Sequence, residues 1–108
     1  MKLITKELLK RFEEVGSQIG SENPIIIAKF IPPLLDGVFY ATDYDTDKKA
    51  FYGYFIDVEH KRYLNCFFTD KSLQVQVSSH CFSAKRDWDF KEIYLSELQN
   101  SLSCILKD

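Results

Sequence analysis

The sequence has few of the residues that usually mark a catalytic or metal centre. Its 108 residues include only 4 glycines, 3 cysteines and 2 histidines. The glycines do not cluster, so a glycine-rich phosphate-binding loop is excluded, and no Gly-x-Ser-x-Gly or His-Glu-x-x-His segment occurs. Cys66, Cys81 and Cys104 are odd in number and form no Cys-x-x-Cys pair. Neither a disulfide framework nor a zinc site is therefore predicted, and reduced thiols are typical of a cytosolic protein.

Long apolar runs and a strong charge of one sign are also missing. No stretch approaches the roughly 20 apolar residues of a membrane helix. Only Leu3 and Ile4 precede Thr5 and Lys6, which is no signal-peptide core. The 14 basic and 16 acidic residues give a net charge of −2, which argues against a dedicated nucleic-acid binder. We expect a soluble, cytoplasmic protein that has no membrane partner and no cofactor.

Hydrophobic and aromatic residues are plentiful. They make up 45% and 15% of the chain, and the aromatics are 9 phenylalanines, 6 tyrosines and 1 tryptophan. A chain of this length and composition is typical of one globular domain, here spanning residues 1–108. The aromatics favour a core and sheet faces that are rich in rings, and the alternative is an exposed aromatic platform for a partner.

Both ends of the chain have helical periodicity. Thr5 has the character of an N-cap, and apolar residues recur at helical spacing after it until Gly16 or Gly20. Asn23-Pro24 then breaks the helix. Near the C-terminus, Ser96-Glu97 lies at the start of a second amphipathic stretch, whose apolar residues are Leu95, Leu98, Leu102, Ile105 and Leu106.

The sequence between the helices has the character of strands. Apolar, β-branched and aromatic residues alternate with polar turns, and the predicted strands are residues 25–31, 38–44, 50–58, 63–69 and 73–77. Residues 78–85 are less regular. Because no helix separates the strands, we predict an α+β fold, with a mostly antiparallel sheet of about five strands, an N-terminal helix and a C-terminal helix.

Three alternating acids, Asp43, Asp45 and Asp47, resemble the opening of a calcium-binding loop. Such a loop requires glycine at its sixth position and glutamate at its twelfth, which here are Lys48 and Tyr54. The pattern therefore predicts a solvated hairpin turn and no assigned metal site. The alternative is a weak divalent-cation contact, since alternation would place the three acidic side chains on one side of an extended chain.

Histidine and cysteine do not form a recognisable catalytic pair. His80 and Cys81 are adjacent, and adjacent residues of an extended segment point to opposite faces. His60 lies in a charged turn, and Cys66, next to Phe67, is interpreted as a small buried apolar residue. An enzyme is consequently the third-ranked hypothesis.

The segment Tyr52-Gly53-Tyr54 has the aromatic-small-aromatic pattern of an RNA-binding strand. The flanking residues Phe51 and Asp57 do not fit that signature. A structural interpretation is that Gly53 lets a neighbouring aromatic ring lie across the strand. Tyr40, Tyr52 and Tyr54 would share one sheet face if the strand register permits.

Several segments together resemble a family of short bacterial proteins of plasmids, phages and conjugative elements, known only as a domain of unknown function. The segments are residues 1–9, 25–30, 39–45 with 51–54, and Arg86-Asp87-x-x-Phe90 followed by Leu95-Ser96-Glu97-Leu98. The chain departs from the family pattern at residues 63–82 and 99–108. The resemblance implies a mobile-element setting, in which small accessory proteins often bind host or phage proteins, but no activity and no site residues.

The leading hypothesis is a non-enzymatic protein-interaction module with an unknown protein partner. Its candidate partner-binding surface combines tyrosines and rim charges: Tyr40, Tyr52, Tyr54, Asp43, Asp45 and Asp47. The alternative is single-stranded nucleic-acid binding by the same face, helped by Lys48, Lys49, Lys61 and Arg62. A homodimer formed through an exposed edge strand is compatible with either hypothesis.

Overall fold

The computed structural model describes residues 4–33, 36–57, 62–69, 74–77 and 79–106. Within these ranges the chain forms two helices, α1 (Lys6–Val15) and α2 (Leu95–Leu106). The strands of the same ranges are β1 (Ile25–Ile26), β2 (Ala28–Ile31), β3 (Gly37–Asp45), β4 (Ala50–Asp57), β5 (Arg62–Thr69), β6 (Gln74–Val77), β7 (His80–Ser83), β8 (Lys85–Arg86) and β9 (Ile93–Tyr94).

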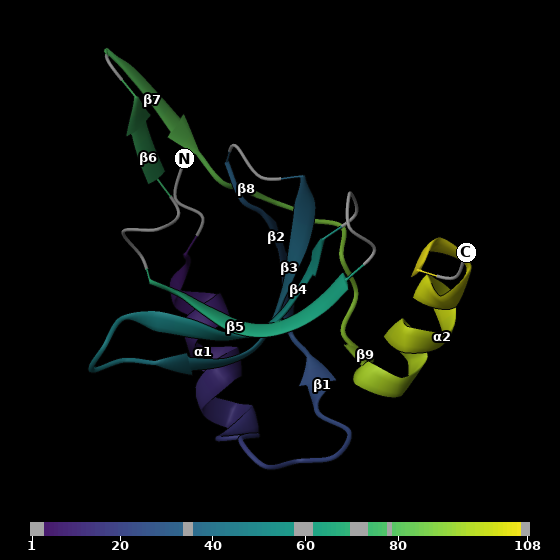
Figure 1. The fold of residues 1–108 in the computed structure, drawn as a ribbon. Helices are drawn as coiled ribbons and strands as arrows, with labels where there is room; N and C mark the ends of the chain where they lie inside the picture. The colour runs from purple at the N-terminus through teal and green to yellow at the C-terminus, as the bar shows by residue number, and fades with distance from the viewer. Residues whose placement is uncertain (1–3, 34–35, 58–61, 70–73, 78, 107–108) are drawn as a thin grey trace.

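A five-stranded sheet is the centre of the fold. Its strand order is β5-β4-β3-β2-β8, and every neighbouring pair is antiparallel. The two helices stand at the two ends of the chain, and Figure 1 shows α1 and α2 well separated on different sides of the sheet. The predicted α+β class, with a mostly antiparallel sheet and terminal helices, is confirmed.

Two of the predicted strands pair differently from what the sequence suggested. Residues 25–31 form two strands, because the main chain changes partners at Ile27: β1 pairs with β9, whereas β2 pairs with β3 and β8. The strand predicted near residue 75 does not join the main sheet. It pairs with β7, which the sequence pattern did not reveal, in a separate hairpin (Figure 1).

Helix α1 forms as predicted and covers one face of the sheet. The Thr5 hydroxyl accepts a hydrogen bond from the Leu8 amide at 3.1 Å, and Gly16 ends the helix with a positive φ of 76°. Leu8 and Phe12 are buried on this face, and the Phe12 ring centroid lies 5.6 Å from that of Phe51. Burial of a side chain of this size stabilises the fold by about 1.5–3 kcal/mol.

The opposite face is partly covered by the C-terminal part of the chain. Leu95 and Leu98 of α2 pack in one cluster with Ile26, Tyr40 and Ile56 of the sheet side. This second cluster is smaller than the first, and its strand residues come from β1, β3 and β4. The cluster does not include Phe67 of β5, so part of the second face lies outside it.

The N-terminus of α2 forms hydrogen bonds with the loop before β1, which is far away in sequence. The Asn23 side-chain oxygen accepts a hydrogen bond from the Ser96 amide at 2.9 Å, and the Pro24 carbonyl accepts one from the Leu95 amide at 2.8 Å. Asn23-Pro24 was predicted only as a helix break. It also satisfies amides at the start of α2 that would otherwise lack a partner within the helix.

Neither helix in the described part of the chain has the length and apolar character that crossing a membrane requires.

Candidate partner-binding site

The strand register places the three tyrosines on one face of the sheet, the face against which α2 packs. Tyr40 on β3 lies opposite Tyr54 on β4, and Tyr52 is two residues away from Tyr54 along the same strand. Side chains two residues apart on a strand point to the same side. The strand register therefore allows Tyr40, Tyr52 and Tyr54 to share one sheet face, as the sequence hypothesis required.

Tyr40 is nevertheless a core residue and does not belong to an accessible surface. Its side chain is only 6% exposed, and its ring centroid lies 6.0 Å from that of Phe90. Burial, with a smaller contribution from the negative charge of Asp87, raises the pKa of the Tyr40 hydroxyl above its ordinary value. Its inclusion in the candidate surface was wrong, because α2 and the segment before β9 cover it.

An accessible group of rings remains at the far end of this face. Tyr52 and Tyr54 are half-buried, and Phe67 on β5 is 59% exposed. Phe67 lies opposite Tyr52 in the β4–β5 pairing, with 5.9 Å between their ring centroids. We call Tyr52, Tyr54 and Phe67 the aromatic face.

Phe67 is the residue that the sequence interpretation missed. The signal was the alternation along β5, because Phe67 and Phe68 must point to opposite sides of the sheet. Phe68 packs on the α1 side, where its ring centroid is 4.7 Å from that of Phe39. Phe67 is consequently left on the other side, on a strand at the edge of the five-stranded sheet.

Cys66 points to the same side as Phe68. It is half-buried and packs against the α1-side cluster. Burial raises the pKa of its thiol, which disfavours the reactive thiolate at neutral pH. Cys66 was predicted to be a small buried apolar residue, and the structure places it in apolar packing but only half-buried.

A β-bulge positions Tyr52 beside Asp43. Ala41 lies opposite Gly53 and Asp43 lies opposite Tyr52, so Thr42 is an extra residue in β3. Gly53 is required here because a Cβ atom at this position would overlap the Tyr40 carbonyl oxygen. The sequence hypothesis assigned the space above Gly53 to an aromatic ring, but main-chain atoms of β3 occupy it.

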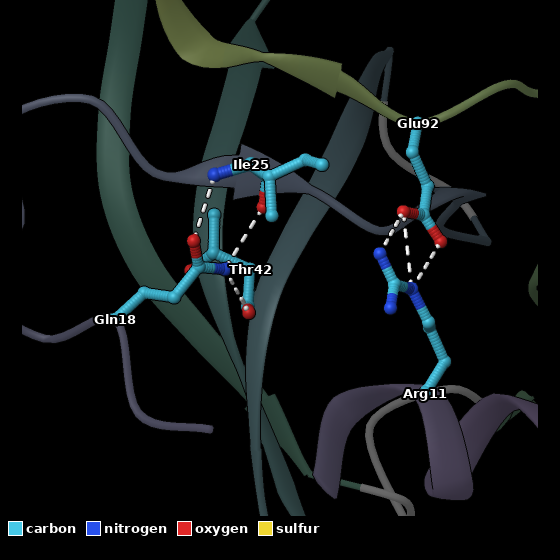
Figure 2. A network of polar contacts seen from close by, with 5 residues as sticks. All are labelled: Arg11, Gln18, Ile25, Thr42 and Glu92. Carbon is cyan, nitrogen blue, oxygen red and sulfur yellow. Dashed lines mark hydrogen bonds and ion pairs between the residues drawn. The ribbon is translucent and has the colours of Figure 1, made fainter. Parts of the chain in front are cut away.

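Gln18 compensates for the interruption of pairing at the bulge. Its side-chain nitrogen donates to the carbonyl oxygens of Thr42 at 2.8 Å and Ile25 at 2.9 Å, and its oxygen accepts from the Ile25 amide at 2.7 Å (Figure 2). One side chain therefore fastens the loop after α1 to both β1 and β3. Figure 2 also shows Arg11 of α1 paired side by side with Glu92, where the shortest contact is 2.8 Å.

The three acids have separate structural roles. Asp43 is only 8% exposed, and its two carboxylate oxygens accept hydrogen bonds from the main-chain amide of Gln18 and the hydroxyl of Thr42, both at 2.7 Å. Asp45 accepts from the amides of Asp47 and Lys48 at 2.9 and 3.1 Å, which forms the predicted hairpin turn. Asp47 is exposed at that turn.

These acids do not form a cation cluster. Among the residues that the structure describes, no three His, Cys, Asp or Glu side chains gather closely enough to hold a metal ion. Asp43 instead contributes negative charge to the aromatic face. Burial and then the charge of Asp43 raise the pKa of the Tyr54 hydroxyl.

The basic residues named in the nucleic-acid hypothesis are only partly placed by the structure. Lys48 and Lys49 are exposed in the β3–β4 turn. Lys61 and the Arg62 side chain lie outside the described part of the chain, as do His60 and the His80 side chain. Lys29, which lies opposite Tyr40, forms an ion pair with Asp87 at 3.5 Å.

A groove of about 900 Å³ lies between α1 and the β3–β4 hairpin. Asp43, Asp45 and Tyr52 are among the residues that line it. Three of the six predicted surface residues therefore meet at one concavity, although no sequence pattern pointed to the concavity itself. We call it the α1–hairpin groove.

No family model, no curated protein sequence and no solved structure matches this chain.

Proposed function

We propose that this chain is a small, non-enzymatic protein-interaction module and that its partner binds the aromatic face. The observation that carries the proposal is the exposure of Phe67, which is 59% accessible while its ring lies against that of Tyr52. Rings on adjacent strands are already ordered, so a partner gains apolar contact area without the full entropic cost of fixing two side chains. Aromatic residues of this kind are enriched among the residues that dominate binding energy at protein interfaces.

The charge around the aromatic face favours a protein partner over a nucleic acid. Asp43 lies opposite Tyr52, and its negative charge acts on the Tyr54 hydroxyl. Single-strand binding surfaces combine stacking rings with a positively charged groove that follows the phosphates. An acid beside the rings opposes phosphate binding, and the net charge of −2 does not compensate for it.

The setting forms part of the same proposal. The segments that resemble the mobile-element family include residues 39–45 and 51–54, which lie within the β3–β4 hairpin that carries Tyr52 and Tyr54. A cytoplasmic accessory protein that binds a host or phage protein fits that resemblance. The edge position of β5 also makes a homodimer through this strand compatible with the proposal.

The test is a set of parallel capture experiments from bacterial lysate with the native chain, the double variant Tyr52→Ser/Phe67→Ser and the control Tyr94→Ser. Tyr94 is also 50% exposed, but it lies on β9, outside the aromatic face. Each arm is run with and without nuclease. The proposal predicts a protein that is captured by the native chain and the control in both nuclease arms, and that is lost with the double variant.

Two results would overturn this function. Equal capture by the native chain and the double variant would remove the aromatic face from binding. Capture that disappears after nuclease treatment, together with oligonucleotide affinity that falls steeply with salt, would establish nucleic-acid binding instead.

A further inference from the structure

The two outer strands of the five-stranded sheet differ in length and charge. One is β5, whose 8 residues all pair with β4 without a shift of register. It contains no proline, and Arg62 at its start is its one charged residue. The other outer strand, β8, consists of two basic residues, Lys85 and Arg86. Because short length and charge protect a sheet edge from pairing with another chain, the β8 edge is protected and the β5 edge is not.

Apolar side chains lie on both sides of β5. Phe67 on the α2 side is 59% exposed, and Cys66 and Phe68 on the α1 side are half-buried. Alternate main-chain N–H and C=O groups of an outer strand point away from its neighbour, where an extended strand can form hydrogen bonds with them. Such a strand would also place side chains beside the apolar groups on both sides of β5. The chemistry of this edge therefore fits an extended strand.

A second copy of β5 can supply that strand through two-fold symmetry. Every neighbouring pair in the sheet is antiparallel, and two copies of β5 related by a two-fold axis perpendicular to the sheet are antiparallel as well. This axis keeps each residue on its own side of the sheet, so residues directly opposite each other must lie on the same side. The pairings that satisfy this rule and join the most residues place either Asn65 or Cys66 on the axis.

Charge and closure both fit a second copy as the occupant of this edge. In the antiparallel arrangement the two Arg62 residues lie toward opposite ends of the paired strands, at least about 20 Å apart along the strand direction, so like charges do not meet. The two β5 edges cover each other, and the outer strands of the joined sheet are then the two copies of β8. Because β8 is short and basic, association stops at two chains.

We propose that two copies of this chain form a homodimer in which their β5 strands pair antiparallel, with Asn65 or Cys66 on the two-fold axis. The two five-stranded sheets then form one continuous sheet. Phe67 of each copy lies on the same side of this sheet, so the aromatic faces of both copies lie on one side of the dimer. The dimer does not rest on the proposed function, because it forms without another partner.

The direct test is sedimentation equilibrium of the purified full chain over a wide concentration range, without nucleic acid or other proteins. We expect a monomer–dimer equilibrium. Asn65 is exposed, lies on β5 and is not part of the aromatic face. Asn65→Lys places two lysines directly opposite each other or on neighbouring diagonal positions, so the dissociation constant of the dimer should rise about fivefold or more.

A charge-reversed variant separates loss of pairing from loss of folding. Asn65→Glu should weaken its own dimer in the same way, whereas an equimolar mixture of the lysine and glutamate variants should recover a dimer, because opposite charges then meet. Ser21→Lys is the matched control, since Ser21 is exposed in the loop before β1 and adds the same charge away from β5. Its dissociation constant should equal that of the native chain.

Cysteine cross-linking tests the position of the axis. In a Cys81→Ser/Cys104→Ser background, mild oxidation should link two copies through Cys66 if Cys66 lies on the axis. If Asn65 lies there, the additional change Asn65→Cys/Cys66→Ser should give the cross-link instead. Residues directly opposite each other in an antiparallel pair have Cα atoms about 4.5–5.5 Å apart, which is within the range of a disulfide.

Either cross-link, together with recovery of the dimer in the mixture, would support the proposal. A chain that stays monomeric at about 1 mM, a dimer that Asn65→Lys does not weaken, or a dimer that gives neither cross-link would contradict it. All of these measurements use purified protein in which Phe67 is unchanged, so this proposal and the protein-interaction proposal fail independently.

Discussion

The ring of Tyr52 lies 5.9 Å from the ring of Phe67, centroid to centroid, across the pairing of β4 with the edge strand β5. This contact joins two residues that face away from the α1-side core. It forms part of the second face of the sheet that lies beyond the cluster around Leu95 and Leu98 of α2. Substitutions on this face can separate the residues that stabilise the fold from those that we propose bind a partner.

The two tyrosines Tyr40 and Tyr52 should respond differently to truncation. Tyr40→Ala should lower the free energy of unfolding by about 3–5 kcal/mol, because it removes a ring that is only 6% exposed. Tyr52→Ala should cost less than about 1.5 kcal/mol, because its ring is half-buried. Urea unfolding followed by the fluorescence of the single tryptophan, Trp88, measures both values. Equal costs would show that the two rings are equally part of the core.

Gly53 should tolerate no side chain. Gly53→Ala places a Cβ atom against the Tyr40 carbonyl oxygen, so β3 and β4 must move apart at the bulge. We expect a loss of at least about 2 kcal/mol in unfolding free energy. Thermal unfolding measured by circular dichroism checks this value. Gly20→Ala is the control, because a Cβ atom added there meets no neighbouring group within 4 Å, although the φ of Gly20 is 88°. A smaller loss at Gly53 than at Gly20 would contradict the close approach at the bulge.

Asn23 should stabilise α2 from outside the helix. Asn23→Ala removes the acceptor of the Ser96 amide and should cost about 1 kcal/mol, whereas Asn23→Asp should retain most of the stability. Hydrogen exchange of the first α2 amides is the sensitive measurement, since the local loss appears there first. Unchanged exchange at Ser96 in the alanine variant would show that the cap is not formed in solution.

Stability should decline at alkaline pH. The pKa values of Tyr40 and Tyr54 are raised in the folded chain, mainly by burial, so the folded state holds these protons more tightly than the unfolded state. The full stability is present below the ordinary tyrosine pKa of about 10 and is lost as the pH rises through the folded values. Urea midpoints across this range test the effect, with Tyr40→Phe as the comparison. A native chain and a Tyr40→Phe variant with the same alkaline slope would exclude Tyr40 as a cause.

Local sequence patterns were sufficient to predict the helices and the main strands. The Thr5 cap, the apolar stripe after it and the run of apolar and aromatic residues in β4 depend on neighbouring residues, and the structure forms the predicted helix and strand there. The change of partner at Ile27 was beyond such patterns. It is set by pairing with β9 and β3, which lie far apart in the chain.

The candidate site was harder to predict from the sequence, because the burial of a side chain depends on the whole fold. Tyr40 and Tyr54 look alike in sequence, and the packing of α2 is what places Tyr40 in the core. Asp43 is buried through a hydrogen bond to Gln18, 25 residues away in sequence. The outward position of Phe67, in contrast, could have been predicted from the alternation of side chains along β5.

The central claim is that the aromatic face binds a protein without stabilising the fold. Phe67→Ser tests it most directly, when the thermal midpoint and the capture of a partner from lysate are measured on the same preparation. We expect a change in unfolding free energy of less than about 1 kcal/mol, because the ring is 59% exposed, together with loss of the partner that the native chain captures. A large loss of stability, or undiminished capture by a stable variant, would contradict it.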